Sequence, residues 1–156
     1  MKITFIQTGG TIDKDYMTTK ENHGYNFEIS KPAVKTVLDK VEPKFVFEIF
    51  TVAKKDSLDL TDADRLKIYQ KCKSIKNDKI IITHGTDTFL KTAKVLSQIK
   101  DKVIILTGAM KPEKFQNFDA MFNVGAAIGA INFLPKGIYI GMNGIISKWN
   151  KYDGAK

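Results

Sequence analysis

The chain has 156 residues, of which 43% are hydrophobic and 27% are charged, values typical of one soluble globular domain. They exclude a disordered chain, a collagen-like fibre and a membrane bundle, because no apolar run approaches the roughly 18–20 residues that cross a bilayer. The net charge is +8, yet Arg65 is the only arginine among 25 basic residues. Because arginine is favoured for bidentate recognition of bases and phosphates, we expect a lysine-rich solvated surface and no nucleic-acid partner.

The cysteine and histidine content narrows the chemistry further. Cys72 is the single cysteine, which excludes an internal disulfide framework and a cysteine-rich zinc site. The two histidines, His23 and His84, are too few for most metal clusters, so no metal site is expected. The apolar opening at residues 1–6 is too short for the core of a signal peptide. We therefore expect a cytoplasmic protein that does not enter a membrane.

Short apolar runs rich in β-branched residues alternate with longer helical patterns. In chain order they predict a strand at 2–7, a helix at 31–41, a strand at 45–52, a helix at 62–75, a strand at 79–83, a helix at 88–99, a strand at 103–107, a helix at 119–133 and a strand at 137–142. Two of the helices begin with typical N-terminal signals: Pro32 in the first turn of one, and Thr61 followed by Asp64 three positions later at the start of the other. Such alternation implies βαβ units. The expected fold is α/β: a doubly wound parallel sheet in a three-layer α/β/α sandwich, forming a single domain over residues 1–156.

Polar residues follow four of the predicted strands where each strand ends. These segments are residues 8–11, 56–57, 84–88 and 107–112. In an open parallel sheet, ligands bind outside the carboxyl ends of the strands. The four segments therefore predict a single site at one edge of the sheet.

The first segment is Thr8-Gly9-Gly10-Thr11. Its two glycines permit a tight turn and close approach of the backbone to a ligand. It is neither a dinucleotide-binding fingerprint nor a P-loop, because the third glycine and the Gly-Lys-Ser/Thr ending are missing. A hydroxyl on such a turn can be a nucleophile, with backbone N–H groups as an oxyanion pocket. A plain strand-to-loop turn is the alternative interpretation.

The third segment, His84-Gly85-Thr86-Asp87-Thr88, places two threonines beside an aspartate, directly after an apolar strand and before a helix. Thr88 or Asp87 can simply cap that helix. In the functional interpretation the Asp87 carboxylate holds a substrate ammonium group, while Thr86 attacks or positions water. A threonine needs a base, because its hydroxyl is a weak nucleophile at neutral pH. A lysine whose pKa is lowered by burial can take that part.

Together, TGGTI at residues 8–12 and HGTDT at residues 84–88 resemble the two signature motifs of the bacterial-type asparaginase/glutaminase family. The segment TGAMKP at 107–112 is similar to the family's next strand end, although arginine is more usual there than Lys111. Asp119 and Asn123, which open the following helix, fit as well. The resemblance covers essentially the whole chain, as an amino-terminal domain of the asparaginase type, and short-chain members are the most similar.

This resemblance implies hydrolysis of L-asparagine to L-aspartate and ammonia, with L-glutamine as an alternative substrate and without metal or cofactor. It assigns Thr11 as the nucleophile that forms a β-acyl-enzyme. Tyr16 is expected to assist Thr11 as a hydrogen-bond partner, and Tyr25 is the rival for that role. Thr86 is expected to orient water or to share the nucleophilic role.

The resemblance also implies a set of substrate-binding residues. Asp87, beside Thr86, would bind the substrate ammonium group, and Ser57 would bind the substrate carboxylate. Gly10 would allow close backbone approach near that carboxylate or the oxyanion. Leu58 stands where many longer members have glutamine, and it suits the short-chain pattern.

The catalytic lysine of the family usually lies about eleven residues after the asparagine that corresponds to Asn143. Counting without gaps reaches Gly154, which is not a lysine. Lys156 fits with a two-residue insertion and is preferred here. Lys151 fits with a three-residue deletion, and an ordinary surface lysine remains an alternative for both. Lys111 is disfavoured, because its motif position belongs to a structural basic residue.

Partners follow less directly from the residues. We expect a small-molecule substrate and a homo-oligomer, with a dimer favoured because the apolar helix around 120–133 and the exposed edge strands can support one. Longer family members complete each site with polar groups from a partner's second domain. Two other functions stay open at this point: a non-catalytic ligand-binding or regulatory module on the same fold, and a phosphate- or nucleic-acid-binding protein, for which only the net charge argues.

Overall fold

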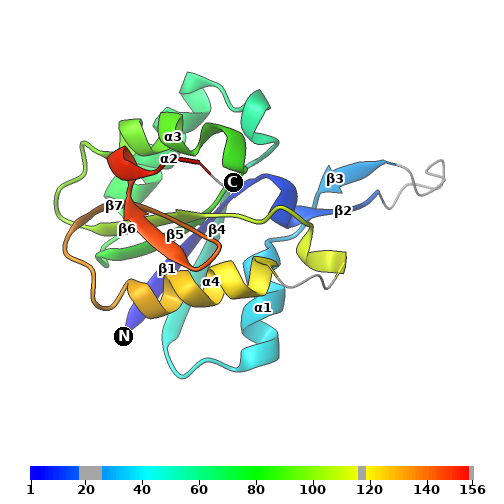
Figure 1. Ribbon diagram of the computed structural model, residues 1–156, viewed down its shortest axis with the longest axis horizontal. Helices are drawn as coiled ribbons and strands as arrows, with labels where there is room; N and C mark the ends of the chain where they lie inside the picture. The colour runs from blue at the N-terminus through cyan, green and yellow to red at the C-terminus, as the bar shows by residue number, and fades with distance from the viewer. Residues whose placement is uncertain (18–25, 116–118, 155–156) are drawn as a thin grey trace.

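The computed structural model of the protein describes residues 1–17, 26–115 and 119–154. Its centre is a six-stranded sheet with the order β4-β1-β5-β6-β7-β8 (Figure 1). In that order the strands are Val46–Lys55, Lys2–Gly9, Lys79–Thr83, Val103–Thr107, Gly137–Met142 and Ile145–Lys148. The first five are parallel and β8 is antiparallel to β7. The prediction of an α/β fold with a doubly wound parallel sheet is confirmed.

The strand sequences explain why this sheet is covered on both faces. β5 is Lys-Ile-Ile-Ile-Thr and β6 is Val-Ile-Ile-Leu-Thr, apolar at successive positions and not at alternate ones. This pattern is typical of parallel strands that bury both faces, and every residue of β6 is buried. The β5–β6 register runs without a shift to the pair Thr83 and Thr107, so these two strands end level at the carboxyl edge.

Two helices cover each face of the sheet, and the four are α1 (Ala33–Val41), α2 (Asp62–Ser74), α3 (Phe89–Leu96) and α4 (Asp119–Ala130). On one face α1 and α4 contribute Val34 and Val124 to the core. On the other face α2 and α3 contribute Ile68 and Leu96. Figure 1 shows the resulting three layers, with the sheet between the two pairs of helices.

The start of α2 shows how a local signal fixes a helix end. The Thr61 hydroxyl accepts the Asp64 N–H at 3.2 Å, and the Asp64 carboxylate accepts the Thr61 N–H at 3.0 Å, which is a complete capping box. Lys55 at the end of β4 donates to the same carboxylate at 2.7 Å. This bond to Lys55, ahead of the bonds from Thr61, holds the pKa of Asp64 well below its usual value.

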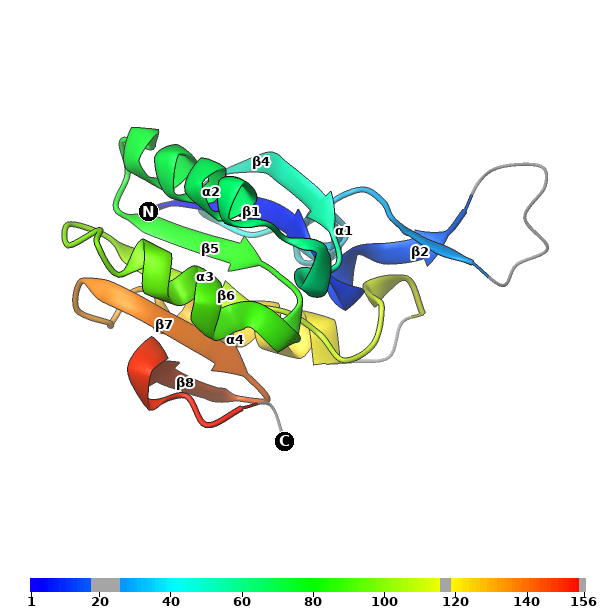
Figure 2. The ribbon, with the colours of Figure 1, turned by 90° about the horizontal axis from the view of Figure 1, so that it is seen from above.

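Two features differ from the expected set of elements. The chain turns at Asn143 and Gly144, both at positive φ, and returns as β8, an antiparallel edge strand that was not expected. Between β1 and α1 lies a two-stranded antiparallel arm, β2 (Lys14–Tyr16) paired with β3 (Phe27–Ile29). Figure 2 shows this arm extending away from the layered body.

Several element ends also differ from the expected ones. β4 runs to Lys55, beyond the expected end at residue 52. α3 begins only at Phe89, because residues Thr86–Thr88 form a 3-10 turn before it. In the part of the chain that the structure describes, no helix combines the length and apolar character needed to cross a bilayer.

Candidate active site

The strand order places the predicted motifs at the switch point of the sheet. β1 lies between β4 and β5, and α1, which follows β1, covers the opposite face of the sheet from α2, which follows β4. Crevices of this kind, outside the carboxyl ends of parallel strands, are the usual ligand sites of doubly wound folds. The segments that follow β1, β4 and β5 are 10–13, 56–59 and 84–88, and all three leave the sheet at this edge.

Gly10 and Gly85 approach each other closely at this edge. Gly10 has φ +84°, and a Cβ on it would lie 2.3 Å from the Gly85 nitrogen. A Cβ on Gly85 would lie 2.6 Å from the Cβ of Ser57. Only glycine fits both positions, because neither leaves space for a side chain. The first and third motifs and Ser57 are therefore packed together, as the sequence predicted.

Thr11 and Thr86 each follow one of these two glycines and each begins a short 3-10 turn. Both are half-buried, so the hydroxyl-bearing turns lie at the surface of this edge of the sheet and not in the core. The Gly10 N–H donates to the Lys55 carbonyl at 3.0 Å. Because this bond uses the Gly10 N–H, Gly10 has no spare N–H for an oxyanion.

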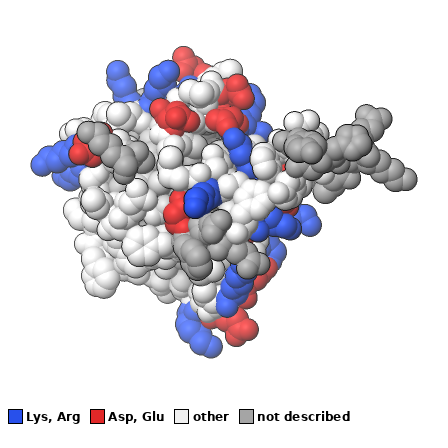
Figure 3. Space-filling view, turned by 45° about the vertical axis from the view of Figure 1, so that its right-hand side comes forward, with Lys and Arg blue, Asp and Glu red and all other residues white. Residues whose placement is uncertain are grey.

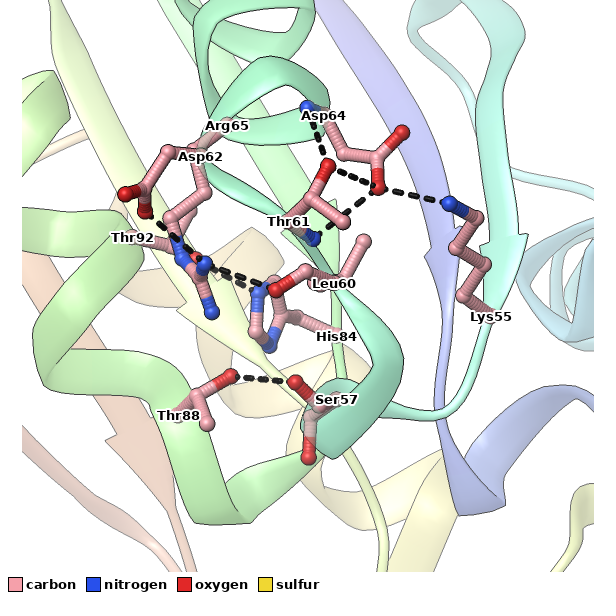
Figure 4. A network of polar contacts seen from close by, with 10 residues as sticks. All are labelled: Lys55, Ser57, Leu60, Thr61, Asp62, Asp64, Arg65, His84, Thr88 and Thr92. Carbon is pink, nitrogen blue, oxygen red and sulfur yellow. Dashed lines mark hydrogen bonds and ion pairs between the residues drawn. The ribbon is translucent and has the colours of Figure 1, made fainter.

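Ser57 and Asp87 are brought together as the second polar pair of the site. The Ser57 hydroxyl donates to the Asp87 carboxylate at 3.1 Å, and the Thr88 hydroxyl donates to the Ser57 carbonyl at 2.9 Å. Figure 4 shows this second contact beside His84. Asp87 itself is exposed, whereas Ser57 is fully buried. The carboxylate is therefore accessible to a ligand, and the serine supports it from below.

His84 is a structural residue of this edge. It is fully buried, with Nδ1 donating to the Gly85 carbonyl at 2.7 Å. Figure 4 shows the other ring contact, in which Nε2 accepts the Thr92 hydroxyl at 2.8 Å. Burial lowers the pKa of His84 to about 4, so the ring is neutral at physiological pH. Both nitrogens are satisfied, and the ring fixes the Gly85 turn to α3.

Thr83, at the end of β5, is hydrogen-bonded to residues on both sides of the Thr11 turn. Its carbonyl accepts the Thr8 hydroxyl at 2.8 Å, and its own hydroxyl donates to the Asp13 carboxylate at 3.3 Å. Asp13 also accepts the Ala33 N–H at 2.8 Å, which caps α1 where Pro32 offers no side-chain acceptor. Burial, the largest effect, raises the pKa of Asp13 to about 7.

The sequence patterns assigned no role to Asp13 or Thr83. A signal for Asp13 does exist, because α1 starts after Pro32 with no side-chain N-cap, and a buried N–H needs an acceptor from elsewhere. No pattern in the sequence points to Thr83, since its contacts depend on how β1 and β5 align.

The neighbouring strand end is braced by α4. The Asn123 side chain donates to the Gly108 carbonyl at 3.0 Å and accepts the Asn143 N–H at 2.8 Å. The Asp119 carboxylate accepts the Met110 N–H at 2.5 Å. These contacts hold the segment after β6 against the turn after β7, so Asp119 and Asn123 support the edge of the site.

Two of the remaining predicted residues, Tyr16 and Lys151, lie away from the Gly10–Gly85 contact. Tyr16 lies on the arm, 45% exposed, with its ring against Phe27 and Phe115 at centroid distances of 5.2 Å and 5.3 Å. Lys151 ends the last 3-10 turn, which follows β8, and is exposed. Lys156 and Tyr25 lie outside the described residues.

The charged side chains on one face of the molecule are dispersed (Figure 3). On the face shown in Figure 3, basic and acidic side chains alternate around the rim and do not merge into one basic surface. Among the described residues, no group of three or more histidine, cysteine or acidic side chains is arranged to hold a metal ion.

A family model described as "Asparaginase, N-terminal" matches residues 2–152 of this chain. A subunit of the glutamyl-tRNA(Gln) amidotransferase of Methanococcus maripaludis is 31% identical over 150 residues, covering 91% of this chain and 35% of that protein. L-asparaginase 2 of Escherichia coli is 34% identical over 135 residues, covering 81% of this chain and 37% of that protein.

Solved structures agree with these matches. The thermostable L-asparaginase from Thermococcus kodakarensis superposes with a TM-score of 0.83 at 26% identity, covering 96% of this chain and 46% of that one. A probable cytoplasmic L-asparaginase from Campylobacter jejuni has a TM-score of 0.74 at 26% identity, with 96% and 48% covered. The chain spans little more than a third of the length of these curated relatives and about half of these solved structures.

Proposed function

Because this chain belongs to the asparaginase family over residues 2–152, we propose that it hydrolyses the side-chain amide of L-asparagine to L-aspartate and ammonia. The observation that carries the proposal is the contact between Gly10 and Gly85. Thr11 and Thr86 directly follow these two glycines, so two hydroxyl-bearing turns leave the same point of the sheet edge. Such a pair can serve the two halves of a covalent amide hydrolysis.

In the first half-reaction the Thr11 hydroxyl oxygen attacks the amide carbon and its proton passes to a base. The tetrahedral intermediate collapses, the C–N bond breaks, and the nitrogen takes a proton and leaves as ammonia. In the second half, water positioned by Thr86 attacks the ester carbon, releasing L-aspartate and restoring the Thr11 hydroxyl. The covalent route replaces one difficult step by two easier ones.

Substrate binding is assigned to the exposed side of the same edge. The Asp87 carboxylate is accessible and has the charge to hold the substrate ammonium group. Ser57 is buried and donates to Asp87, so it reaches a substrate carboxylate only when that hydroxyl turns away from Asp87. L-Glutamine, one methylene longer, is the alternative substrate.

The base and the hydrogen-bond partner of Thr11 are assigned from the family resemblance. We assign the base to Lys156, with Lys151 as the alternative. The last described residue, Gly154, lines the same cavity as Asn143, beyond the end of β7, which makes the segment that follows Gly154 a reasonable source of that lysine. Tyr16, with Tyr25 as its rival, is assigned as the hydrogen-bond partner of Thr11, and it would need the arm to bend toward the crevice.

We further propose that residues 1–156 act as a catalytic domain in the cytoplasm, without metal or cofactor, and that the working form is a homodimer. The exposed face of α4 supports the dimer. Met121 and Phe122 are 42% and 59% exposed on that helix, and Ile145 on β8 is 71% exposed. The Phe122 ring lies against Gly144, so this apolar surface runs continuously from α4 to the β7–β8 turn.

The test is ammonia release from L-asparagine and from L-glutamine by the intact chain and by two variants. Thr11→Ala and Thr86→Ala are each expected to lower kcat by on the order of 10³-fold or more, because each removes a group that acts on the reacting atoms. Thr36→Ala is the matched control, because Thr36 is exposed on α1, and it is expected to leave kcat unchanged.

Two outcomes of this assay would contradict the proposal. Turnover that both threonine variants retain would contradict the threonine mechanism. An intact chain that binds L-aspartate in calorimetry but releases no ammonia would overturn the hydrolase proposal in favour of a non-catalytic ligand-binding module on the same fold.

A further inference from the structure

Asp13 is a buried ionisable residue to which the proposed mechanism assigns no role. Asp13 is 2% exposed, although it lies only two residues after the proposed nucleophile Thr11. A buried carboxyl group destabilises the fold unless hydrogen bonds compensate it. Its position therefore calls for a reason beyond the folding of a turn.

The contacts of Asp13 tie three elements together. One carboxylate oxygen accepts the Ala33 N–H at 2.8 Å and the other accepts the Thr83 hydroxyl at 3.3 Å, while the Gln7 amide also bonds to the carboxylate. The Asp13 carbonyl accepts the Ser30 N–H at 2.9 Å. The turn that carries Thr11 is thus held to β1, to β5 and to the start of α1 by this one residue.

The bond to Thr83 has the most direct bearing on the site. Thr83 ends β5 and precedes Thr86 by three residues, and its carbonyl also accepts the Thr8 hydroxyl at 2.8 Å. Thr8 before the Thr11 turn and Asp13 at its end therefore both hydrogen-bond to Thr83, the last residue of the strand that leads into the Thr86 turn. Loss of these bonds would let the two turns shift relative to each other without unfolding either strand.

We propose that Asp13 is a positioning residue whose carboxylate holds the Thr11 turn in register with the Thr86 turn. This inference rests on the proposed function only in its kinetic consequence. The relative placement of two reacting groups matters steeply, since a displacement of about 1 Å can lower a rate on the order of 10²-fold.

The surroundings of Asp13 let its protonation state be followed near neutral pH. Burial raises its pKa to about 7, against the lowering effects of its hydrogen bonds and of the Lys54 charge. The cavity beside it is lined by charged groups of both signs from β2, from the segment before α1 and from the 3-10 turn Glu113–Phe115, namely Lys14, Asp15, Lys31, Glu113 and Lys114.

The ionised and protonated forms differ in how well they hold the turn. The ionised carboxylate accepts from all of its donors, and hydrogen bonds to a charged acceptor are the stronger kind. The protonated form carries a hydrogen on one oxygen, so its bonds are of the weaker neutral kind and the contact with the Thr83 hydroxyl persists only with its direction reversed. The Thr11 turn is therefore expected to be held more firmly in register with the Thr86 turn as the pH rises through about 7.

The kinetic test compares pH profiles of kcat/KM for L-asparagine. Asp13→Asn is expected to match the wild type below pH 6 and to fall about 10-fold to 100-fold below it above pH 8, through kcat more than KM. Thr83→Val removes one bond that lowers the pKa of Asp13, so its inflection is expected to move to higher pH. The double variant is expected to behave like Asp13→Asn alone, because the two side chains act as one unit.

Asp15→Asn is the matched control. Asp15 lines the same cavity, and its backbone contact to Tyr16 can be kept by asparagine, so its profile is expected to follow the wild type. An activity loss in Asp13→Asn that is equal at every pH would mark a merely structural role and overturn the proposal. An inflection near pH 7 that survives in Asp13→Asn would also overturn it.

A second readout separates this inference from the proposed hydrolysis. In amide NMR spectra of the ligand-free protein, the Thr11 and Thr86 resonances are expected to titrate near pH 7 in the wild type and in Asp15→Asn, and to be flat there in Asp13→Asn. Resonances that do not titrate in the wild type would disprove the positioning role even if ammonia is released. Resonances that titrate in a chain that releases no ammonia would keep this inference and refute the proposed function.

Discussion

Gly10 occupies a position where only glycine fits. Its φ of +84° and the 2.3 Å that would separate an added Cβ from the Gly85 nitrogen both forbid a side chain. Gly10→Ala is therefore expected to lower the free energy of unfolding by about 2 kcal/mol or more. Chemical denaturation of the purified variant measures this change.

Gly125 is the matched control, because it lies inside α4 with no atom within 4 Å of its Cβ position. Gly125→Ala is expected to raise the free energy of unfolding by about 0.5–1 kcal/mol, through the reduced freedom of the unfolded chain. Equal effects of the two substitutions would show that the Gly10–Gly85 packing does not constrain the fold.

Single residues also show where sequence reasoning reaches its limit. The glycine turns and Asp87 could be proposed as site residues from the sequence because the types and spacing of glycine, threonine and aspartate indicate their chemistry. Asp13 was missed because its importance arises from burial between α1 and β5, which no local pattern reports. Ser57 was assigned to the substrate from resemblance, and only the structure places its hydroxyl on Asp87 in a fully buried position.

At the scale of elements, α2 depends on its capping box. Thr61→Ala removes the acceptor of the Asp64 N–H and the hydroxyl donor to the Asp64 carboxylate. We expect the free energy of unfolding to fall by about 1 kcal/mol, measured by chemical denaturation. Ser74→Ala, at the exposed carboxyl end of the same helix, is expected to change it by less than about 0.5 kcal/mol. A Thr61→Ala variant as stable as Ser74→Ala would contradict the capping argument.

The elements differ in how readily the sequence predicts them. Isoleucine-rich runs such as β5 and β6 were identified with their observed ends, because buried parallel strands are apolar at every position. β8 was missed although Asn143-Gly144 is a strong hairpin signal. The arm strands β2 and β3 have three residues each, too few for any periodicity to appear.

At the scale of the whole molecule, two buried groups act in opposite directions on stability. The pKa of His84 falls from 6.5 to about 4, so the unfolded chain binds the extra proton between these values and stability rises with pH. The pKa of Asp13 rises from 3.8 to about 7, so the folded chain binds the extra proton and stability falls with pH. Each effect amounts to at most about 3–4 kcal/mol, and the two nearly cancel between pH 4 and 6.5.

Asp13→Asn removes the effect that lowers the free energy of unfolding as the pH rises and leaves that of His84. Its free energy of unfolding is expected to rise by about 2–3 kcal/mol from pH 4 to 6.5, whereas that of the wild type stays nearly flat. The other described groups with shifted pKa values act below pH 4 or above pH 9. Denaturation at a series of pH values measures the slope, with Asp15→Asn as the flat control. Parallel profiles for wild type and Asp13→Asn would refute the opposing roles.

The position of β1 in the sheet has a consequence for the order in which the molecule is made. β1 is synthesised first, yet both of its partners, β4 and β5, come later, at residues 46–55 and 79–83. Contacts between segments so distant in the chain form late in folding, because the intervening loops must close first. The Thr11 turn therefore meets the Thr86 turn only after synthesis has passed residue 86, and the nascent chain carries the first of these two turns long before it can pack against the second.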